Sequence, residues 1–237
     1  MLNQGTIIAK ATGAGSSAIS LFRLSGSDAI RMVTKCFQPM SEKKLADQKS
    51  HTVHLGTLHD KGSPLDEVLV SIFKAPHSYT GENVVEISCH GSNFIQEEIL
   101  RLFISIGAQQ AKPGEFTLRA FLNKKMDLSQ AEAVADLIVS ESKAAHEVAM
   151  NQMRGGYTAE IAQLRQKLLD FASLITLELD FAEEDVAFAD RTALKDLLGS
   201  LQSKIKSLLD SFHYGSVIKK GVPVAIVGKP NAGKSSL

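Results

Sequence analysis

The chain has 237 residues, 44% of them hydrophobic and 22% charged, which is typical of a globular protein with one large or two smaller domains. Its 26 Lys and Arg residues balance 26 Asp and Glu residues, so no overall charge points to a nucleic acid or a membrane. Two cysteines exclude a disulfide framework, and the absence of a leader or long apolar run predicts a cytoplasmic protein with no signal peptide and no membrane partner.

The first half of the chain mixes strand and helix patterns. Apolar spacing of three and four residues predicts helices at 28–37 and 94–106. Pro64 is expected to interrupt the strands. Short β-branched or apolar runs predict strands at residues 6–9, 18–24, 52–58, 68–73 and 84–88. These elements predict an α+β N-terminal domain over residues 1–117.

A helical pattern follows. Ser129 and Glu132 fit a capping box at the start of a helix that runs to Arg154. Two further helices are predicted at 158–181 and 192–213. Long helices joined in this way favour an α-helical bundle domain over residues 118–215, incomplete in this chain.

The last part of the chain, residues 216–237, is predicted to begin a third domain. Residues 215–221 are interpreted as a linker, and the apolar run 222–227 as the first strand of an α/β P-loop GTPase domain. The next eight residues match G-x-x-x-x-G-K-[ST], the loop whose backbone N–H groups surround phosphates. The predicted nucleotide contacts are Gly228, Asn231, Ala232, Gly233, Lys234, Ser235 and Ser236.

Each residue type in this loop suits its chemistry. Lys234 places a positive charge beside the β- and γ-phosphates, and Ser235 offers a hydroxyl to Mg²⁺. The pattern strongly indicates nucleotide phosphate but indicates guanine only weakly, because base-reading residues lie further downstream. No catalytic residue is assigned, and we expect this chain not to hydrolyse a nucleotide by itself.

Several short motifs run through the chain in a fixed order. They are Thr6-Ile7-Ile8-Ala9, Phe22-Arg23-Leu24-Ser25-Gly26, Ser78-Tyr79-Thr80-Gly81-Glu82-Asn83, Pro113-Gly114-Glu115-Phe116, Arg119-Ala120-Phe121-Leu122-Asn123, Lys125-Met126-Asp127-Leu128-Ser129 and the loop from Gly228 to Ser236. Together, along the whole chain, they resemble the tRNA modification GTPase family MnmE, also called TrmE.

The resemblance implies three domains. The first, similar to folate-dependent aminomethyltransferases, would bind 5-formyltetrahydrofolate and form a homodimer. The second is a helical domain that helices beyond the GTPase domain complete, and the third is the inserted GTPase domain, which uses GTP, Mg²⁺ and K⁺. Together with an MnmG (GidA)-like FAD protein in a heterotetramer, the family adds an aminomethyl-type group at C5 of the wobble uridine of certain tRNAs.

The resemblance also implies site residues. Arg23, Glu86 and Lys125 would contact the folate, and Asn231 and Ser235 would contact K⁺ and Mg²⁺. Arg23 and Lys125 can meet the carboxylates of the glutamyl tail, while Glu86 can accept from the amino-pyrimidine edge of the pterin.

The chain departs from the family pattern at two places. Ser92 replaces the second glycine of the usual His-Gly-Gly, and the segments that would follow Leu237 are absent, among them the guanine-reading segment and a C-terminal cysteine motif. Three hypotheses remain open: a tRNA-modifying GTPase, a folate-binding dimerisation module without nucleotide turnover, and an unrelated P-loop ATPase or kinase.

Two tempting patterns are set aside on geometry. His51, His54 and His59 have metal-ligand spacing, but strand alternation directs His54 away from the other two. Cys89 and His90 would make a nucleophile and base, but adjacent strand residues point to opposite faces.

Overall fold

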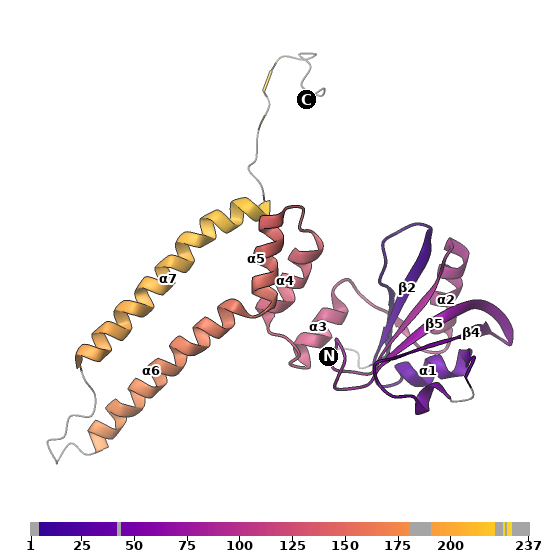
Figure 1. The fold of residues 1–237 in the computed structure, drawn as a ribbon, viewed down its shortest axis with the longest axis horizontal. Helices are drawn as coiled ribbons and strands as arrows, with labels where there is room; N and C mark the ends of the chain where they lie inside the picture. The colour runs from indigo at the N-terminus through magenta and orange to yellow at the C-terminus, as the bar shows by residue number, and fades with distance from the viewer. Residues whose placement is uncertain (1–4, 42–43, 181–190, 221–224, 226, 229–237) are drawn as a thin grey trace. The chain divides into compact units, whose positions relative to one another are not determined.

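The computed structural model describes residues 5–41, 44–180, 191–220, 225 and 227–228. The chain divides into two compact units, Met1–Ala131 and Glu132–Leu237, drawn in indigo to pink and in pink to yellow in Figure 1. Helix α3 (Glu115–Leu122) crosses the domain boundary predicted at residue 117, and the predicted domain limits remain predictions.

The first unit is built on a mixed seven-stranded sheet with the order β3-β4-β5-β6-β2-β1-β7. All neighbouring strands run antiparallel except β1 and β7, which are parallel. The strands are β1 (Ile7–Lys10), β2 (Ser17–Ser25), β3 (Phe37–Pro39), β4 (Thr52–Asp60), β5 (Ser63–Phe73), β6 (Val84–Gly91) and β7 (Gln109–Gln110).

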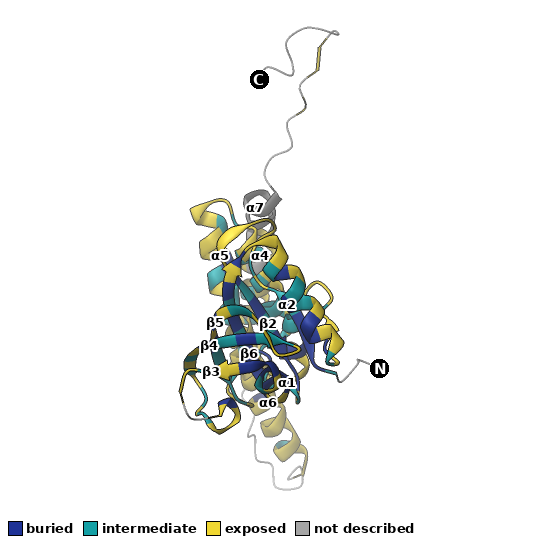
Figure 2. Cartoon of the chain, turned by 90° about the vertical axis from the view of Figure 1, so that its right-hand side faces the viewer, coloured by how far each residue is buried: buried dark blue, intermediate teal, exposed yellow. Residues whose placement is uncertain are grey.

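Two helices cover one face of this sheet. Helices α1 (Ala29–Cys36) and α2 (Asn93–Ser105) share a single apolar core with the strands, whose buried positions are dark blue in Figure 2. Successive side chains of a strand point to opposite faces of the sheet. The residues that alternate with the core residues therefore form the second face, here called the outer face. Helix α3 and a 3₁₀ turn (Leu45–Asp47) complete the elements of the unit before α4.

The five predicted strands and both predicted helices of this unit are present. The break expected at Pro64 is wrong, because Pro64 lies one residue inside β5 at the bulged end of the β4–β5 hairpin. Ser92 is the N-cap of α2: its hydroxyl accepts a hydrogen bond from the Ile95 N–H at 3.2 Å. The departure from the family pattern at this position therefore strengthens a helix start.

The second unit is helical. Its first helix, α4 (Leu128–Ile138), spans the boundary between the two units. It is followed by α5 (Lys143–Met153), α6 (Gly156–Asp180) and α7 (Arg191–Lys220), which contact one another. The single helix predicted from 129 to 154 is wrong, because the Ser142 hydroxyl accepts from the Ala145 N–H and starts a new helix there.

Two further expectations in this region are corrected. The capping box of α4 is formed by Asp127 and Gln130, whose side chains accept each other's backbone N–H at 2.8 and 2.9 Å, and not by the predicted pair two residues later. The predicted linker is helical as far as Lys220, since one glycine costs a helix only about 1 kcal/mol and no proline interrupts it there. Of the predicted strand 222–227, only residues 225 and 227 are described, and neither lies in a strand.

Gly56 offers a direct test of the sheet edge. A Cβ at this position would lie 2.3 Å from the Gln38 carbonyl oxygen and 2.6 Å from the Phe37 ring. Gly56→Ala is therefore expected to lower the free energy of unfolding by about 1–3 kcal/mol, measured by urea denaturation. Gly199→Ala is the control, because it lies in α7 with open space around it and is expected to stabilise by about 0.5–1 kcal/mol. Equal stability of Gly56→Ala and the parent protein would contradict the packing described.

Candidate functional site

Two of the predicted folate residues form an ion pair on the outer face. The register of β2 and β6 places Arg23 directly opposite Glu86. The Arg23 Nε and Nη2 both donate to Glu86 Oε1, at 2.8 and 2.7 Å, and the two side chains are 28% and 21% exposed. Charge-assisted bonds are stronger than neutral ones, and partial burial reduces their screening by salt.

Two aromatic rings lie beside the guanidinium group of this pair. The Arg23 Cζ is 5.3 Å from the centre of the Tyr79 ring and 5.8 Å from that of Phe116, both within cation–π distance. The Tyr79 hydroxyl is 2.9 Å from the Thr117 hydroxyl, which ties the ring to α3. The guanidinium therefore keeps its orientation through contacts with a strand, a loop and a helix.

Lys125, the third predicted folate residue, lies just beyond α3. Its Nζ donates to the Pro76 carbonyl oxygen at 3.1 Å, and its Cγ lies close to Gly81, where a Cβ would be 3.3 Å away. Gly81 has a φ of 78°, a conformation that L side chains rarely adopt. The loop that carries Tyr79 thus contacts both Arg23 and Lys125, and Arg23 in turn pairs with Glu86.

The buried Arg119 belongs to one of the family motifs, although the sequence alone assigned it no role. It lies on α3, and it pairs with Glu82 of the loop and Glu115 of its own helix, both at 3.1 Å. The roles of Tyr79 and Phe116 were missed as well, because an aromatic residue in a polar loop carries no spacing signal. Their only signal was their place in family motifs.

His90 and Cys89, at the end of β6, point to opposite faces, as expected. The His90 Nδ1 lies 2.7 Å from Asp66 Oδ1 and its backbone N–H donates to Asp66 Oδ2 at 2.8 Å, with the imidazole exposed. Cys89 is buried in the core, where its thiol lies 3.4 Å from the Ser20 carbonyl oxygen. The two side chains cannot act on each other.

Apolar side chains occupy much of the outer face beside the ion pair. The register aligns Leu55 with Leu69, and the Met40 N–H donates to the Leu55 carbonyl oxygen. All three side chains are exposed, as are Val53 and Ile19 on the same face. Exposed apolar side chains on neighbouring strands, such as Leu55 and Leu69, are typical of sites of association.

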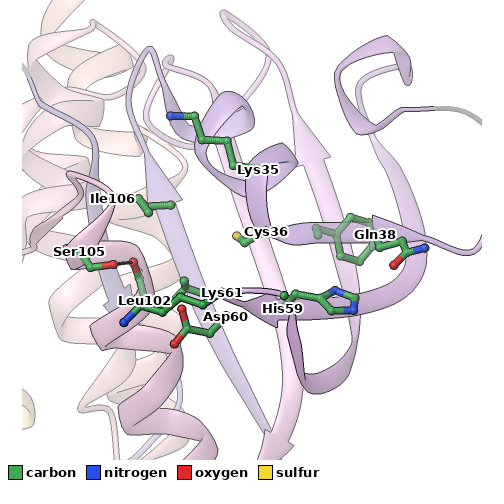
Figure 3. Close-up of a pocket in the computed structure, with 11 residues that line it drawn as sticks. Lys35, Cys36, Gln38, His59, Asp60, Lys61, Leu102, Ser105 and Ile106 are labelled. Carbon is green, nitrogen blue, oxygen red and sulfur yellow. Dashed lines mark hydrogen bonds between the residues drawn. The ribbon is translucent and has the colours of Figure 1, made fainter.

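One cavity of about 610 Å³ lies away from these residues (Figure 3). It lies at the C-terminal ends of α1 and α2 and at the β4–β5 turn, and its lining includes the charged residues Lys35, Asp60 and Lys61 and the apolar Leu102. It combines charges of both signs and contains none of the predicted site residues. The candidate functional site is therefore placed at Arg23 and its contacts and not in this cavity.

The phosphate loop lies outside the described residues apart from Gly228, which is exposed. Asn231, Ala232, Gly233, Lys234, Ser235 and Ser236 therefore stay predictions. In the described ranges, no three His, Cys, Asp or Glu side chains are grouped as a metal site would require. Among the described residues, no helix has both the length and the apolar character that crossing a bilayer requires.

Comparison with protein families matches both units. A family model described as "GTP-binding protein TrmE N-terminus" matches residues 6–125. A second, described as "MnmE helical domain", matches residues 128–223. The first match contains Arg23, Glu86 and Lys125.

Curated relatives match along the whole chain. Proteins named "tRNA modification GTPase MnmE" are 58% identical over 237 residues in Flavobacterium johnsoniae and 54% identical over 237 in Bacteroides thetaiotaomicron, in each case 100% of this chain and 51% of the relative. One in Christiangramia forsetii is 60% identical over 232 residues, 98% of this chain and 49% of the relative. The chain thus spans about half the length of the curated relatives it matches.

The buried thiols generate a pH prediction. Burial, with a smaller contribution from a nearby aspartate, raises the pKa of Cys36 from 9.0 to about 12 and that of Cys89 to about 11. The folded protein keeps these protons where the unfolded chain releases them, so this stabilisation is complete below pH 9 and is lost as pH rises through 11 to 12. The free energy of unfolding should fall as pH rises from 9.0 to about 11, and less steeply in Cys36→Ala. Urea denaturation across this range measures both slopes, and equal slopes would contradict the burial of the thiol.

Proposed function

The chain belongs to the MnmE (TrmE) family, and we propose that the full-length protein is a GTPase that modifies tRNA. The observation that carries this proposal is the match of both units, over residues 6–125 and 128–223, to the two family models. We propose that the protein works with an MnmG (GidA)-like FAD protein in a heterotetramer, in the cytoplasm, and adds an aminomethyl-type group to C5 of the wobble uridine of certain tRNAs.

The GTPase activity would reside in the domain that begins at the phosphate loop. The relative from Flavobacterium johnsoniae aligns over all 237 residues, so the loop lies within the similar region. Lys234 would neutralise the β- and γ-phosphates, Ser235 would hold Mg²⁺ and Asn231 would offer its side-chain oxygen to K⁺. A cation at each of these places offsets the charge that develops on the transferred phosphoryl group.

Lys234→Ala tests this assignment in the full-length protein. Loss of the lysine should lower kcat for GTP hydrolysis by at least about 100-fold, because electrostatic stabilisation of this kind is usually the largest part of catalysis. Lys220→Ala is the control: it removes a positive charge at the end of α7, outside the motif. GTP hydrolysis that survives Lys234→Ala would reject the phosphate loop as the active site, and faster hydrolysis of ATP than GTP would favour the unrelated ATPase.

The folate would bind on the outer face at the Arg23–Glu86 pair. Because both Arg23 contacts fall on Oε1 of Glu86, Oε2 of this carboxylate is available to accept hydrogen bonds from the amino-pyrimidine edge of 5-formyltetrahydrofolate. Lys125 is exposed and has no described carboxylate within ion-pair distance, so its ammonium suits the glutamyl tail. Arg23 would act mainly by orienting Glu86.

Glu86→Gln tests the folate site in the full-length protein. The amide keeps the shape but removes the charge that pairs with Arg23 and with the pterin, so the affinity for 5-formyltetrahydrofolate should fall by about tenfold or more. Ser88→Ala, two residues along the same face of β6, should bind as the parent does. Isothermal titration calorimetry measures both affinities. Unchanged binding by Glu86→Gln would remove this carboxylate from the site.

The apolar outer face supports a homodimer formed through the first unit. Leu55, Leu69 and Met40 are exposed on it, and a second copy would bury them. Coverage of the face would also exclude water from the Arg23–Glu86 pair. Dimer formation through this unit is thus compatible with folate binding on the same face.

A folate-binding dimerisation module without nucleotide turnover is the second candidate for these 237 residues taken alone. It is favoured because every described residue of the candidate site lies in the unit Met1–Ala131. Analytical ultracentrifugation with folate titration and a GTPase assay on this chain distinguishes the two: a folate-binding dimer that hydrolyses no GTP would identify the module.

A further inference from the structure

Arg119 is almost completely buried and, within the part of the chain that the structure describes, donates to four acceptor atoms. Its side chain is 7% exposed. Nη1 donates to both carboxylate oxygens of Glu82, at 3.3 and 3.1 Å, while Nη2 donates to the Gly5 carbonyl oxygen at 2.9 Å and to Glu115 Oε1 at 3.1 Å. One guanidinium thus joins α3 to the chain before β1 and to the loop between β5 and β6.

Glu82 extends this network to β2. The Ser25 hydroxyl donates to Glu82 Oε2 at 2.7 Å and lies 2.7 Å from the Thr80 hydroxyl. The Asn123 side-chain N–H donates to the Thr80 carbonyl oxygen at 2.7 Å, and the Ser78 hydroxyl donates to the Glu82 carbonyl oxygen at 2.6 Å. Of the two neighbours of Tyr79, Thr80 is therefore tied to β2 and to the end of α3, and Ser78 is tied to the backbone of Glu82.

Both rings beside Arg23 depend on these ties. Tyr79 lies between the fixed residues Ser78 and Thr80, and Phe116 follows Glu115, which Arg119 binds directly. Neither Arg119 nor Glu82 has a described contact with Arg23 or Glu86. Any effect of Arg119 on that pair must pass through the positions of the loop and of α3.

The geometry requires an arginine. Its planar fork of N–H groups reaches two carboxylates and a backbone carbonyl at once, whereas a lysine ammonium is a single point charge with three donors. The positive charge lies between Glu82 and Glu115, whose side chains are 26% and 13% exposed. Lysine would keep the charge but not the directions of the bonds.

We propose that Arg119 is the positioning residue of the candidate folate site, because its bonds to Glu82 and Glu115 set the places of Tyr79 and Phe116 beside Arg23. This inference rests on the proposed function for the identity of the ligand. It assigns the rings, rather than Arg119 itself, to contact with the Arg23 guanidinium.

The test compares Arg119→Lys with the parent in the full-length protein. The affinity for 5-formyltetrahydrofolate, measured by calorimetry, should fall by about tenfold, because loosely held site residues lose their productive geometry. Ile99→Val, a core variant of α2, is the matched control for general destabilisation and should keep the affinity of the parent. Equal loss in the two variants, or parent-like binding by Arg119→Lys, would overturn the proposal.

A second measurement does not depend on folate. These 237 residues contain no tryptophan, and Phe116→Trp places one beside Arg23. Subtracting the fluorescence of the parent protein from that of Phe116→Trp leaves the emission of the new tryptophan alone. The wavelength of this emission should shift when Arg119→Lys is added. An unchanged emission would overturn the positioning role. If the parent protein binds no folate, the proposed ligand is wrong, and this emission still decides the role of Arg119.

Discussion

The antiparallel register of β2 and β6 is the constraint on which the candidate site depends. It sets Phe22 opposite Ile87 on the core face and Arg23 opposite Glu86 on the outer face. A slip of one residue would turn Phe22 outward and bury the arginine in the core, so the apolar core holds the ion pair in register. The core and the site are alternate residues of the same two strands, and they cannot be changed independently.

The site also depends on a polar network that fills the space between the sheet and α3. Arg119, Glu82 and Glu115 bring one positive and two negative groups into a poorly solvated region, where incomplete hydrogen bonding is costly. Ser25 and a backbone carbonyl supply further partners. A displaced loop would leave these buried charges without their partners, so the network holds the loop in place.

Local sequence patterns predicted the larger helices and strands, but they could not predict contacts between residues far apart in the sequence. Strands β4 to β6 and helices α1 and α2 have clear periodicity, whereas β3 and β7, with three and two residues, are too short to show any. The end of α4 was missed because its break is made by a Ser142 hydroxyl rather than by glycine or proline. Arg23 and Glu86 were predicted as site residues from family motifs, but their contact joins residues 63 apart and required the sheet register.

The position of an ion pair within an apolar face links ligand binding to association. Salt and water weaken the attraction between Arg23 and Glu86 while the outer face is open, and an interaction between charges grows as the surrounding dielectric constant falls. If the proposed homodimer covers Leu55 and Leu69, it also excludes water from the Arg23–Glu86 pair. The hydrogen bonds between Glu86 and the polar edge of the ligand then become stronger. Thermodynamic linkage then requires that the ligand strengthen the dimer by the same factor. A folate on this face would accordingly act as part of the interface, and the order of the two binding events would not alter the stability of the final complex.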